Sequence, residues 1–560
     1  MKAIYYGPDT TTNSDSLLGS ILSPISGIVA VDTETISLSD NTIIGIGLCA
    51  NGTNSFYFPL IPVMSEVLFE ILDLLARKDI TKVLHNATFD IIALRKFCRQ
   101  WKLPEIDVDN IQDTSLLAQN NGLEPDLHTL GNKYLQEYNL FTVQSLLAEA
   151  RIRENKKIVN MLDVPINDVA RKCNNDVRVT FNLLPKLREL STDRTWDSYR
   201  VDIKLLSKLK HIEDRGFKLD HDVLEQKHSD LTTKIEYLRA ICENEGFNPG
   251  STQQVGMVLA QRGMVMPLTK SGKQLDTSEE QLEKLSHPLA KVVLEYRGAT
   301  KLDSTYVVPW LNSDRAFTHF RLDLSTGRLA SFDRNMQNIP PDLRNVFNPD
   351  NDIFTWGDMS QAEMRVFAYL SQDPVMLEAY TTNKSLHEIT FRAIYPHLQF
   401  DKTTDWYVKS KTFNFAMIFN ASDNVIAAQT KTTVPETHRV KQEWFKLYPR
   451  AYPFMQECMA VQSEYVEDIF GRKMRLPDAN IYGPTHVNTC KINYPVQGST
   501  ASINKRALLY IMDNVSGEDI RLQVHDEFVN DGPIVFPKEI DEIYPGLVIP
   551  FEVKEGPKWS

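Results

Sequence analysis

The chain is organised around residues 354–371, which read FTWGDMSQAEMRVFAYLS. A short run of aromatic and β-branched residues that ends at Gly357 predicts a strand, and apolar residues at helical spacing beyond Ser360 predict a helix. Asp358 is therefore expected where a buried strand meets solvent. A carboxylate on such a rigid element suits a divalent cation such as Mg²⁺, which prefers oxygen ligands. One carboxylate, however, does not hold a catalytic pair of ions.

A second apolar run, residues 522–529, is interrupted by two adjacent acids and reads LQVHDEFV. Charges in the middle of such a run mark a turn, so we expect a hairpin whose tip carries Asp526 and Glu527. Asp358 and Asp526 could then bridge two metal ions about 3.5–4 Å apart, which stabilise the attacking and leaving oxygens of a phosphoryl transfer. Taken alone, an acidic pair is more often an ordinary pair of turn residues.

A third group of acids lies near the N-terminus. Asp32 and Glu34 are two residues apart in an apolar, strand-like segment, so both carboxylates point to one face. Alone, this pair reads as exposed strand acids. Asp90 follows in a helical segment, and Asp176 falls inside a helix that is expected to start near Pro165.

Composition describes an ordinary globular protein. The chain has 560 residues, 42% hydrophobic and 24% charged, and is too long for one core. We find no signal peptide and no apolar run that could span a membrane, and the six cysteines lack paired spacing, so a reducing cytoplasm fits best. The net charge of -12 means that any DNA-binding surface must be a local basic groove.

Three blocks resemble family A DNA polymerases, the bacterial DNA polymerase I type, and occur in that family's order. They are residues 358–365, the set Lys411, Asn414 and Phe415, and residues 523–527. The resemblance implies a right-hand polymerase domain with palm, fingers and thumb. It also implies two Mg²⁺ ions on Asp358 and Asp526, assisted by the Met359 carbonyl, and it places Glu527 beside them.

The four acids Asp32, Glu34, Asp90 and Asp176 resemble those of the ribonuclease H-like 3′-5′ exonuclease domain that the family shares with ribonuclease D-like proteins. The resemblance implies two further Mg²⁺ ions, replaceable by Mn²⁺, and proofreading. The family usually carries a tyrosine four residues before the last acid, where this chain has Lys172. Either Lys172 is buried and acts in a deprotonated form, or it is an exposed lysine in an enzyme that hydrolyses slowly or uses another residue.

The implied fold is multidomain, α/β and α+β, with five segments. We expect an exonuclease domain at 1–196, a thumb at 197–310, palm at 311–372 and 489–560, and fingers at 373–488. The 5′-nuclease domain of full-length bacterial enzymes is missing, so we expect a compact phage polymerase that acts in the host cytoplasm as a monomer, with replisome proteins as further partners.

The resemblance also implies contacts to DNA and dNTP. Those to primer-template DNA are Arg328, Asn335, Gln337, Asn493, Gln497 and His525, and those to the nucleotide are Gln361, Glu363, His387, Lys411, Phe415 and Phe419. Arginine and amide side chains donate to minor-groove acceptors that every base pair carries. Residues 407, 411, 415 and 419 share one slanting helix face, a pattern that alone is more often a packed helix. Glu363 also completes a capping-box pattern, so helix capping is its alternative role.

The predicted nucleotide-binding helix departs from the family at several positions. Tyr407 replaces an arginine, with Lys409 as a substitute cation, and Ala416, Phe419 and Asn420 also differ. Phe415 in place of tyrosine predicts discrimination against dideoxynucleotides. We therefore expect template-directed DNA synthesis with 3′-5′ exonuclease proofreading in viral DNA replication. The alternatives are a polymerase with an inactive exonuclease, a nuclease whose polymerase half only holds DNA, and a non-catalytic scaffold. The complete set of carboxylates argues against the last two.

Overall fold

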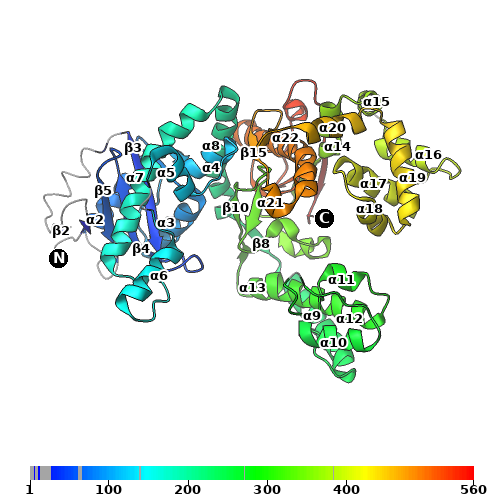
Figure 1. Cartoon of the computed structure of the whole chain (residues 1–560), viewed down its shortest axis with the longest axis horizontal. Helices are drawn as coiled ribbons and strands as arrows, with labels where there is room; N and C mark the ends of the chain where they lie inside the picture. The colour runs from blue at the N-terminus through cyan, green and yellow to red at the C-terminus, as the bar shows by residue number, and fades with distance from the viewer. Residues whose placement is uncertain are drawn as a thin grey trace.

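The computed structural model describes residues 27–559 together with residue 25 and the strands at 5–6 and 11–12, but not residues 61–65, 138–139, 270 and 383. Figure 1 shows a wide molecule with a sheet domain at the N-terminal side and helical segments at the far side and below. Smaller sheets and the long helix α22 (Pro484–Asn514) lie between them.

The N-terminal domain is built on a mixed sheet. Its strands run across the sheet in the order β2 (Thr11–Thr12), β1 (Tyr5–Tyr6), β5 (Ser55–Pro59), β4 (Ile43–Cys49), β3 (Ile28–Thr35), β6 (Thr81–Leu84) and β7 (Ile111–Asp113). Strand β3 pairs antiparallel with β4 and parallel with β6. The helices are α2 (Glu66–Ala76), α3 (Ala87–Trp101), α4 (Thr114–Asn120), α5 (Leu127–Leu135), α6 (Val143–Glu154) and α7 (Ile166–Leu190). Helix α7 packs across β3, β4, β5 and β6.

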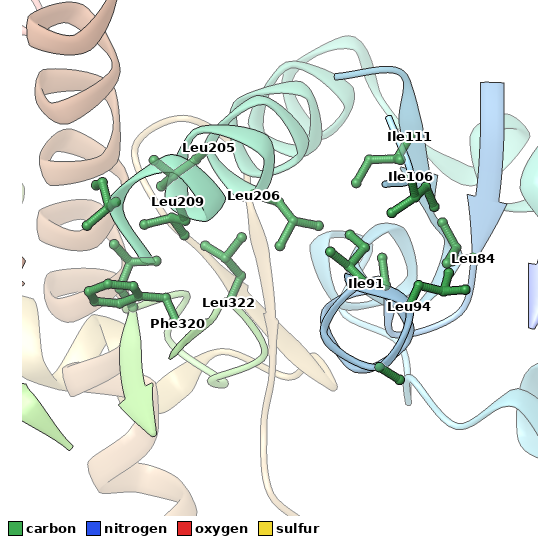
Figure 2. Packing of buried hydrophobic residues seen from close by; sticks show 14 of the residues in the cluster. Leu84, Ile91, Leu94, Ile106, Ile111, Leu205, Leu206, Leu209, Phe320 and Leu322 are labelled. Carbon is green, nitrogen blue, oxygen red and sulfur yellow. The ribbon is translucent and has the colours of Figure 1, made fainter. Parts of the chain in front are cut away.

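Helix α8 (Asp193–Arg215) joins this domain to the rest of the chain. Figure 2 shows its Leu205, Leu206 and Leu209 between Ile91 and Leu94 on one side and Phe320 and Leu322 on the other. All seven side chains are buried, and each such residue contributes about 1.5–3 kcal/mol by leaving water. The two parts therefore share one continuous core.

A buried ion network reinforces the same junction. Asp202 on α8 pairs with Arg472 and with Lys505, whose Nζ lies 2.5 Å from Asp202 Oδ1. Burial raises the pKa of Asp202, but the two cations outweigh it and lower that pKa to about 2. Burial lowers the pKa of Lys505 to about 8 despite its partner. The carboxylate of Asp202 is thus the counter-charge for two buried cations.

The central part contains four small sheets. An antiparallel sheet has the order β16 (Ile520–Val524), β17 (Glu527–Asp531), β13 (Phe354–Met359) and β18 (Phe551–Gly556). The others are β12 (Phe347–Asn348) with β8 (Phe217–Leu219) and β9 (Arg315–Ala316), β10 (His319–Arg321) with β11 (Ala330–Phe332), and β14 (Tyr465–Glu467) with β15 (Lys473–Arg475). Helix α22 packs on α8, on α14 (Ala362–Ser371) and on α20 (Ala451–Ala460).

Two helical segments project from this centre (Figure 1). One comprises α9 (His221–Asn244), α10 (Thr252–Gln261), α11 (Glu279–Glu283) and α12 (Pro288–Leu302), followed by the short α13 (Val308–Trp310). The other comprises α15 (Pro374–Thr381), α16 (Leu386–Ile394), α17 (Asp405–Ile418), α18 (Asp423–Thr430), α19 (Val434–Leu447) and α20, and α21 (Ala479–Tyr482) comes before α22. Each segment has its own apolar core, and the second core extends to α14 and α22.

No helix among the described residues is long and apolar enough to cross a membrane. All six cysteines lie in the described part of the chain and none forms a disulfide, as their spacing predicts.

Candidate active sites

The first site lies on the sheet that contains β13. Asp358 on β13 is in register with Glu527 on β17 and with Glu552 on β18, so three carboxylates stand side by side across neighbouring strands. The backbone N–H of Met359 donates to the carbonyl oxygen of Asp526 over 3.0 Å. The predicted strand, helix and hairpin are confirmed, with β13 continuing through Asp358 to Met359 and with Asp526 at the hairpin tip.

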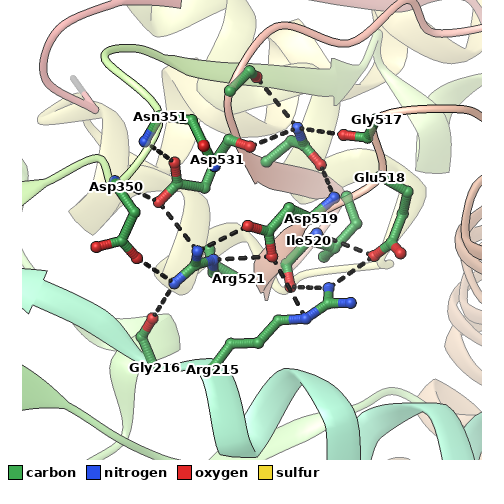
Figure 3. A network of polar contacts seen from close by, with 12 residues as sticks. Arg215, Gly216, Asp350, Asn351, Gly517, Glu518, Asp519, Ile520, Arg521 and Asp531 are labelled. Carbon is green, nitrogen blue, oxygen red and sulfur yellow. Dashed lines mark hydrogen bonds and ion pairs between the residues drawn. The ribbon is translucent and has the colours of Figure 1, made fainter.

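An ion network anchors the base of the β16–β17 hairpin (Figure 3). Arg521 pairs with Asp519, Asp350 and Asp531, at 2.7, 2.9 and 3.3 Å. Asp531 also accepts hydrogen bonds from the backbone N–H groups of Asp350 and Asn351, each over 2.8 Å. Because the hairpin is fixed at its base, its tip is held against β13.

Crowding of acids perturbs this site. Burial raises the pKa of Asp526 to about 7, with further contributions from Glu363 and Asp358. Burial and the Glu552 carboxylate raise the pKa of Asp358. Burial also raises the pKa of Glu527, although Trp559 Nε1 donates to its Oε1 over 2.9 Å. A bound cation would relieve the repulsion among these carboxylates. Because Mg²⁺ prefers oxygen ligands, the acids of this site fit that ion.

The capping role considered for Glu363 is wrong. Helix α14 begins after Gln361, which has a left-handed backbone and makes no side-chain cap, while Ser360 Oγ donates to Glu552 Oε1 over 2.8 Å. The Glu363 carboxylate instead pairs with Arg328. Two residues predicted to contact nucleotide and DNA therefore contact each other.

The nucleotide-binding face predicted on α17 carries exposed Lys411 and half-buried Phe415, Phe419 and Tyr407. His387, on α16, lies against this face with its ring centre 5.9 Å from that of Phe415. Burial, and then the charge of Lys411, lower the pKa of His387 to about 4. Lys409 does not lie free beside Tyr407, because its Nζ sits 4.5 Å from the ring centre of Trp406.

The predicted DNA contacts differ in accessibility. His525 is exposed at the hairpin tip, and Asn335 and Gln497 are half-buried. Asn493 is half-buried too, but its Oδ1 is buried and has no partner among the described residues. Gln337 is buried; its amide donates to Gln523 Oε1 over 2.8 Å and accepts from the N–H of Ser331 over 2.9 Å. The side chain of Gln337 is thus committed within the protein, and DNA contact by this set stays a prediction.

The second site lies where α3 and α7 meet β3. Asp32 and Glu34 share one face of β3, Asp90 comes from the first turn of α3 and Asp176 from α7. Asp90 Oδ1 accepts hydrogen bonds from the N–H and the hydroxyl of Thr33, at 3.0 and 2.6 Å. The predicted helix start at Pro165 is confirmed. A cavity of about 150 Å³ is lined by Asp32, Glu34 and Asp90.

One of the two alternatives considered for Lys172, the exposed lysine, is wrong, and the burial that the other assumed is confirmed. Lys172 is buried, and its Nζ lies 2.8 Å from Glu34 Oε1 and 2.8 Å from Asp176 Oδ2. Burial lowers the pKa of Lys172, but Asp176 and Glu34 outweigh it and hold that pKa well above its usual value. The side chain is therefore not an exposed lysine, and its two carboxylate partners favour the ammonium form over a neutral base.

The acids of this site also fit a cation. Burial raises the pKa of Asp32, of Glu34 and of Asp90, the last to about 7. Asp176 is 5% exposed, and its Oδ1 is buried without a hydrogen-bond partner in the described part of the chain. An orphaned carboxylate oxygen within a group of acids is the kind of atom that a metal ion satisfies.

Sequence reasoning missed two groups at these sites. Glu552 was hidden in an alternating strand pattern, and only pairing of β18 with β13 brings it beside Asp358. Cys173 was treated as one of six scattered cysteines, yet its Sγ lies 3.5 Å from Asp32 Oδ2. Ligand atoms of Asp32, Glu34 and Cys173 lie within 4.8 Å of one another. The signal that could have identified Cys173 is its position in the sequence, because it directly follows Lys172 and lies three residues before Asp176 in the same predicted helix.

Residues 220–544 match the family described as DNA polymerase family A, and residues 11–191 match the one described as 3'-5' exonuclease. DNA polymerase I of Synechocystis sp. is 28% identical over 584 aligned positions, covering 92% of this chain and 57% of the relative. DNA polymerase I of Pseudomonas aeruginosa is 27% identical, covering 90% and 59%. The chain thus spans about half the length of the curated relatives it matches.

A solved structure shares the fold. It is titled as the POL domain of Pol1 from M. smegmatis in complex with DNA primer-template and dNTP. Its TM-score is 0.73 at 23% identity, with 98% of each chain covered.

Proposed function

Because the chain belongs to DNA polymerase family A, we propose that it is a DNA-directed DNA polymerase that extends a primer on a template with dNTPs. The observation that carries the proposal is the union of Asp358 on β13 with Asp526 at the hairpin tip, joined by the hydrogen bond from Met359 N–H to Asp526. It brings together two acids that are far apart in the sequence, which supports the metal site that the family resemblance implies.

Asp358, Asp526 and the Met359 carbonyl would hold two Mg²⁺ ions, which supply charge stabilisation to the attacking and leaving oxygens when bound. Glu527 is oriented beside them by Trp559 Nε1. Rigid placement matters, because groups aligned in advance lower the barrier without reorganising during the reaction.

The dNTP would lie against α17. Lys411 is exposed and places a positive charge where the triphosphate would lie, and Phe415 offers a ring for stacking at the nascent base pair. Gln361, Glu363 and Phe419 complete the proposed nucleotide contacts. Arg328 would either leave its ion pair with Glu363 to contact the primer, or stay paired with it. In the second case the pair would disfavour a nucleotide that carries a ribose 2′-hydroxyl.

We propose that the N-terminal domain is a 3′-5′ exonuclease that uses Asp32, Glu34, Asp90 and Asp176. Support comes from the family match over residues 11–191 and from the geometry: Asp32, Glu34 and Asp90 line one cavity, and Asp176 is tied to Glu34 through Lys172. These acids would hold the catalytic metal, which activates water and stabilises the leaving oxygen when bound. The four acids lie close together in this chain even though Lys172 replaces the tyrosine that the family usually carries.

The domain assignment follows the same reasoning. We propose exonuclease, thumb, palm and fingers at 1–196, 197–310, 311–372 with 489–560, and 373–488. The boundary at 196 falls inside α8, which packs on both neighbours. The monomeric state, replisome partners and phage origin stay predictions.

One end-labelled primer on a longer template tests both activities. With Mg²⁺ and dNTPs we expect a longer primer, and with Mg²⁺ alone a shortened one. Shortening without extension would favour a nuclease whose polymerase half only holds DNA. Extension without shortening would indicate a polymerase with an inactive exonuclease domain. The absence of both extension and shortening would favour a non-catalytic scaffold.

A further inference from the structure

Lys172 lies between two of the four exonuclease acids. Its Nζ is equally distant, at 2.8 Å, from Glu34 Oε1 on β3 and from Asp176 Oδ2 one turn further along α7. The side chain is buried, so water does not screen these contacts. An internal cation therefore already ties the strand to the helix at the point where the acids converge.

The charge balance of the site follows from this contact. Four ionised carboxylates are neutralised by two divalent ions, as in a two-metal site. With a buried ammonium present, two divalent ions would leave an excess positive charge, whereas one divalent ion leaves a single negative charge. Net charge alone does not separate these two cases, but a second divalent cation beside the buried Lys172 would be repelled by it, which favours one ion.

We propose that the Lys172 ammonium takes the place of one of the two metal ions, so that the exonuclease site binds a single divalent ion. This inference rests on the proposed exonuclease function, since it concerns the same four acids. Lys172 holds one oxygen of Glu34 and one of Asp176. The ion would bind on the side of Asp32.

The ligand atoms that Lys172 leaves free lie close enough together to bind a single ion. Asp32, Glu34 and Cys173 offer atoms within 4.8 Å of one another, and Asp32 also lines the adjacent cavity. Carboxylate oxygens suit Mn²⁺ as well as Mg²⁺, so Mn²⁺ can serve as the probe ion for this set. Lys172 would act as a fixed charge that positions Glu34 and Asp176.

The number of bound ions tests the inference. Mn²⁺ would be titrated into the full chain carrying D358N and D526N, which removes the polymerase acids, and free Mn²⁺ followed by electron paramagnetic resonance. We expect one tightly bound ion with Lys172 present and a second ion in K172M, which keeps the length of the side chain but removes its charge. The neighbouring exposed Arg171 provides the matched control, and R171M should still bind one.

Two tight ions with Lys172 present would overturn the inference, and so would one ion in both Lys172 and K172M proteins. Absence of any tight ion in both would overturn the exonuclease proposal as well, which separates the two failures.

Thermal unfolding provides a check that does not depend on counting. Mn²⁺ should raise the unfolding temperature of K172M more than that of the Lys172 protein, because a ligand stabilises the folded state in proportion to its binding. An equal rise would contradict the inference.

Discussion

The side-chain amide of Asn414 donates to Nδ1 of His387 over 3.0 Å, and this contact fixes which imidazole nitrogen carries the proton. Trp444 Nε1 donates to Asn414 Oδ1 over 2.8 Å, and since an indole N–H only donates, the amide has one orientation. Nδ1 of His387 is therefore the acceptor and Nε2 the donor. Nε2 is buried and without a partner in the described part of the chain, and we propose that it donates to a phosphate oxygen of the nucleotide.

Replacing Asn414 with Asp should make nucleotide binding depend on pH. A carboxylate at 414 would hold the proton on Nδ1, so His387 would lose its Nε2 proton as pH rises, and with it the donor. A hydrogen bond to a charged group contributes about 1.5–3 kcal/mol, so the KM for dNTP should rise about tenfold to a hundredfold. Steady-state extension from pH 6 to 9 measures this. N424D, an exposed change on α18, should keep the parent profile, and an unchanged profile in N414D would refute the tautomer assignment.

Replacing Asp526 with Asn should stabilise the protein at pH 8 in the absence of metal. The folded-state pKa of Asp526, about 7, lies above its ordinary value, so the protonated acid favours the fold at low pH and that contribution is lost as pH rises through 7. An amide does not ionise, so D526N should gain on the order of 4 kcal/mol at pH 8 and about half of that at pH 5.5. Thermal unfolding in a chelator at both pH values is the measurement. The exposed E555Q is the control, and an equal effect at both pH values would contradict the account.

Replacing Asp202 with Asn should weaken the junction between α8 and α22. The change leaves Arg472 and Lys505 as buried cations without their counter-charge, which costs about 3–5 kcal/mol. In the parent this stabilisation is complete above about pH 4 and is lost as pH falls toward 2, because the pKa of Asp202 is depressed. Urea unfolding compares D202N with D197N, whose carboxylate pairs with Arg506 at the exposed surface of the same helix. Equal destabilisation by both would argue against the buried network.

Replacing Phe415 with Tyr should increase the use of dideoxynucleotides relative to dNTPs. The family resemblance attributes this choice to a hydroxyl that replaces the missing 3′-OH, and the half-buried Phe415 ring is accessible on the proposed nucleotide face. A hydrogen bond of this kind contributes about 1 kcal/mol or more, so the ratio should rise at least about fivefold. Competition between ddNTP and dNTP in primer extension measures it. F419Y lies one turn further along, and a rise there equal to that of F415Y would show that position 415 does not set the preference.

Local pattern was enough to predict the elements that carry the acids. The strand and helix around Asp358, the hairpin at Asp526 and the shared face of Asp32 and Glu34 are all confirmed. Each depends on apolar periodicity interrupted by charge, which a single sequence displays.

Contacts between distant segments were beyond that pattern. The approach of Glu552 to Asp358 depends on which strand pairs with β13, and the ion pair of Glu363 with Arg328 displaced a capping role that local spacing favoured. Lys172 was misread for the same reason. Burial lowers its pKa, and Asp176, one turn along the same helix, and Glu34, on a strand, raise it; only the contact with Glu34 could not be inferred from the local sequence.

The central claim is that Asp358 and the hairpin tip form the polymerase site, and the rate of adding one nucleotide in a single turnover tests it most directly. Parent, D526N and D352N would be compared on one primer-template after its binding is shown to be equal by fluorescence anisotropy; Asp352 is an exposed acid just before β13. We predict a loss of about a thousandfold in D526N, which corresponds to several kcal/mol of charge stabilisation, and no change in D352N. A D526N protein that binds DNA and adds the nucleotide at the parent rate would contradict the claim.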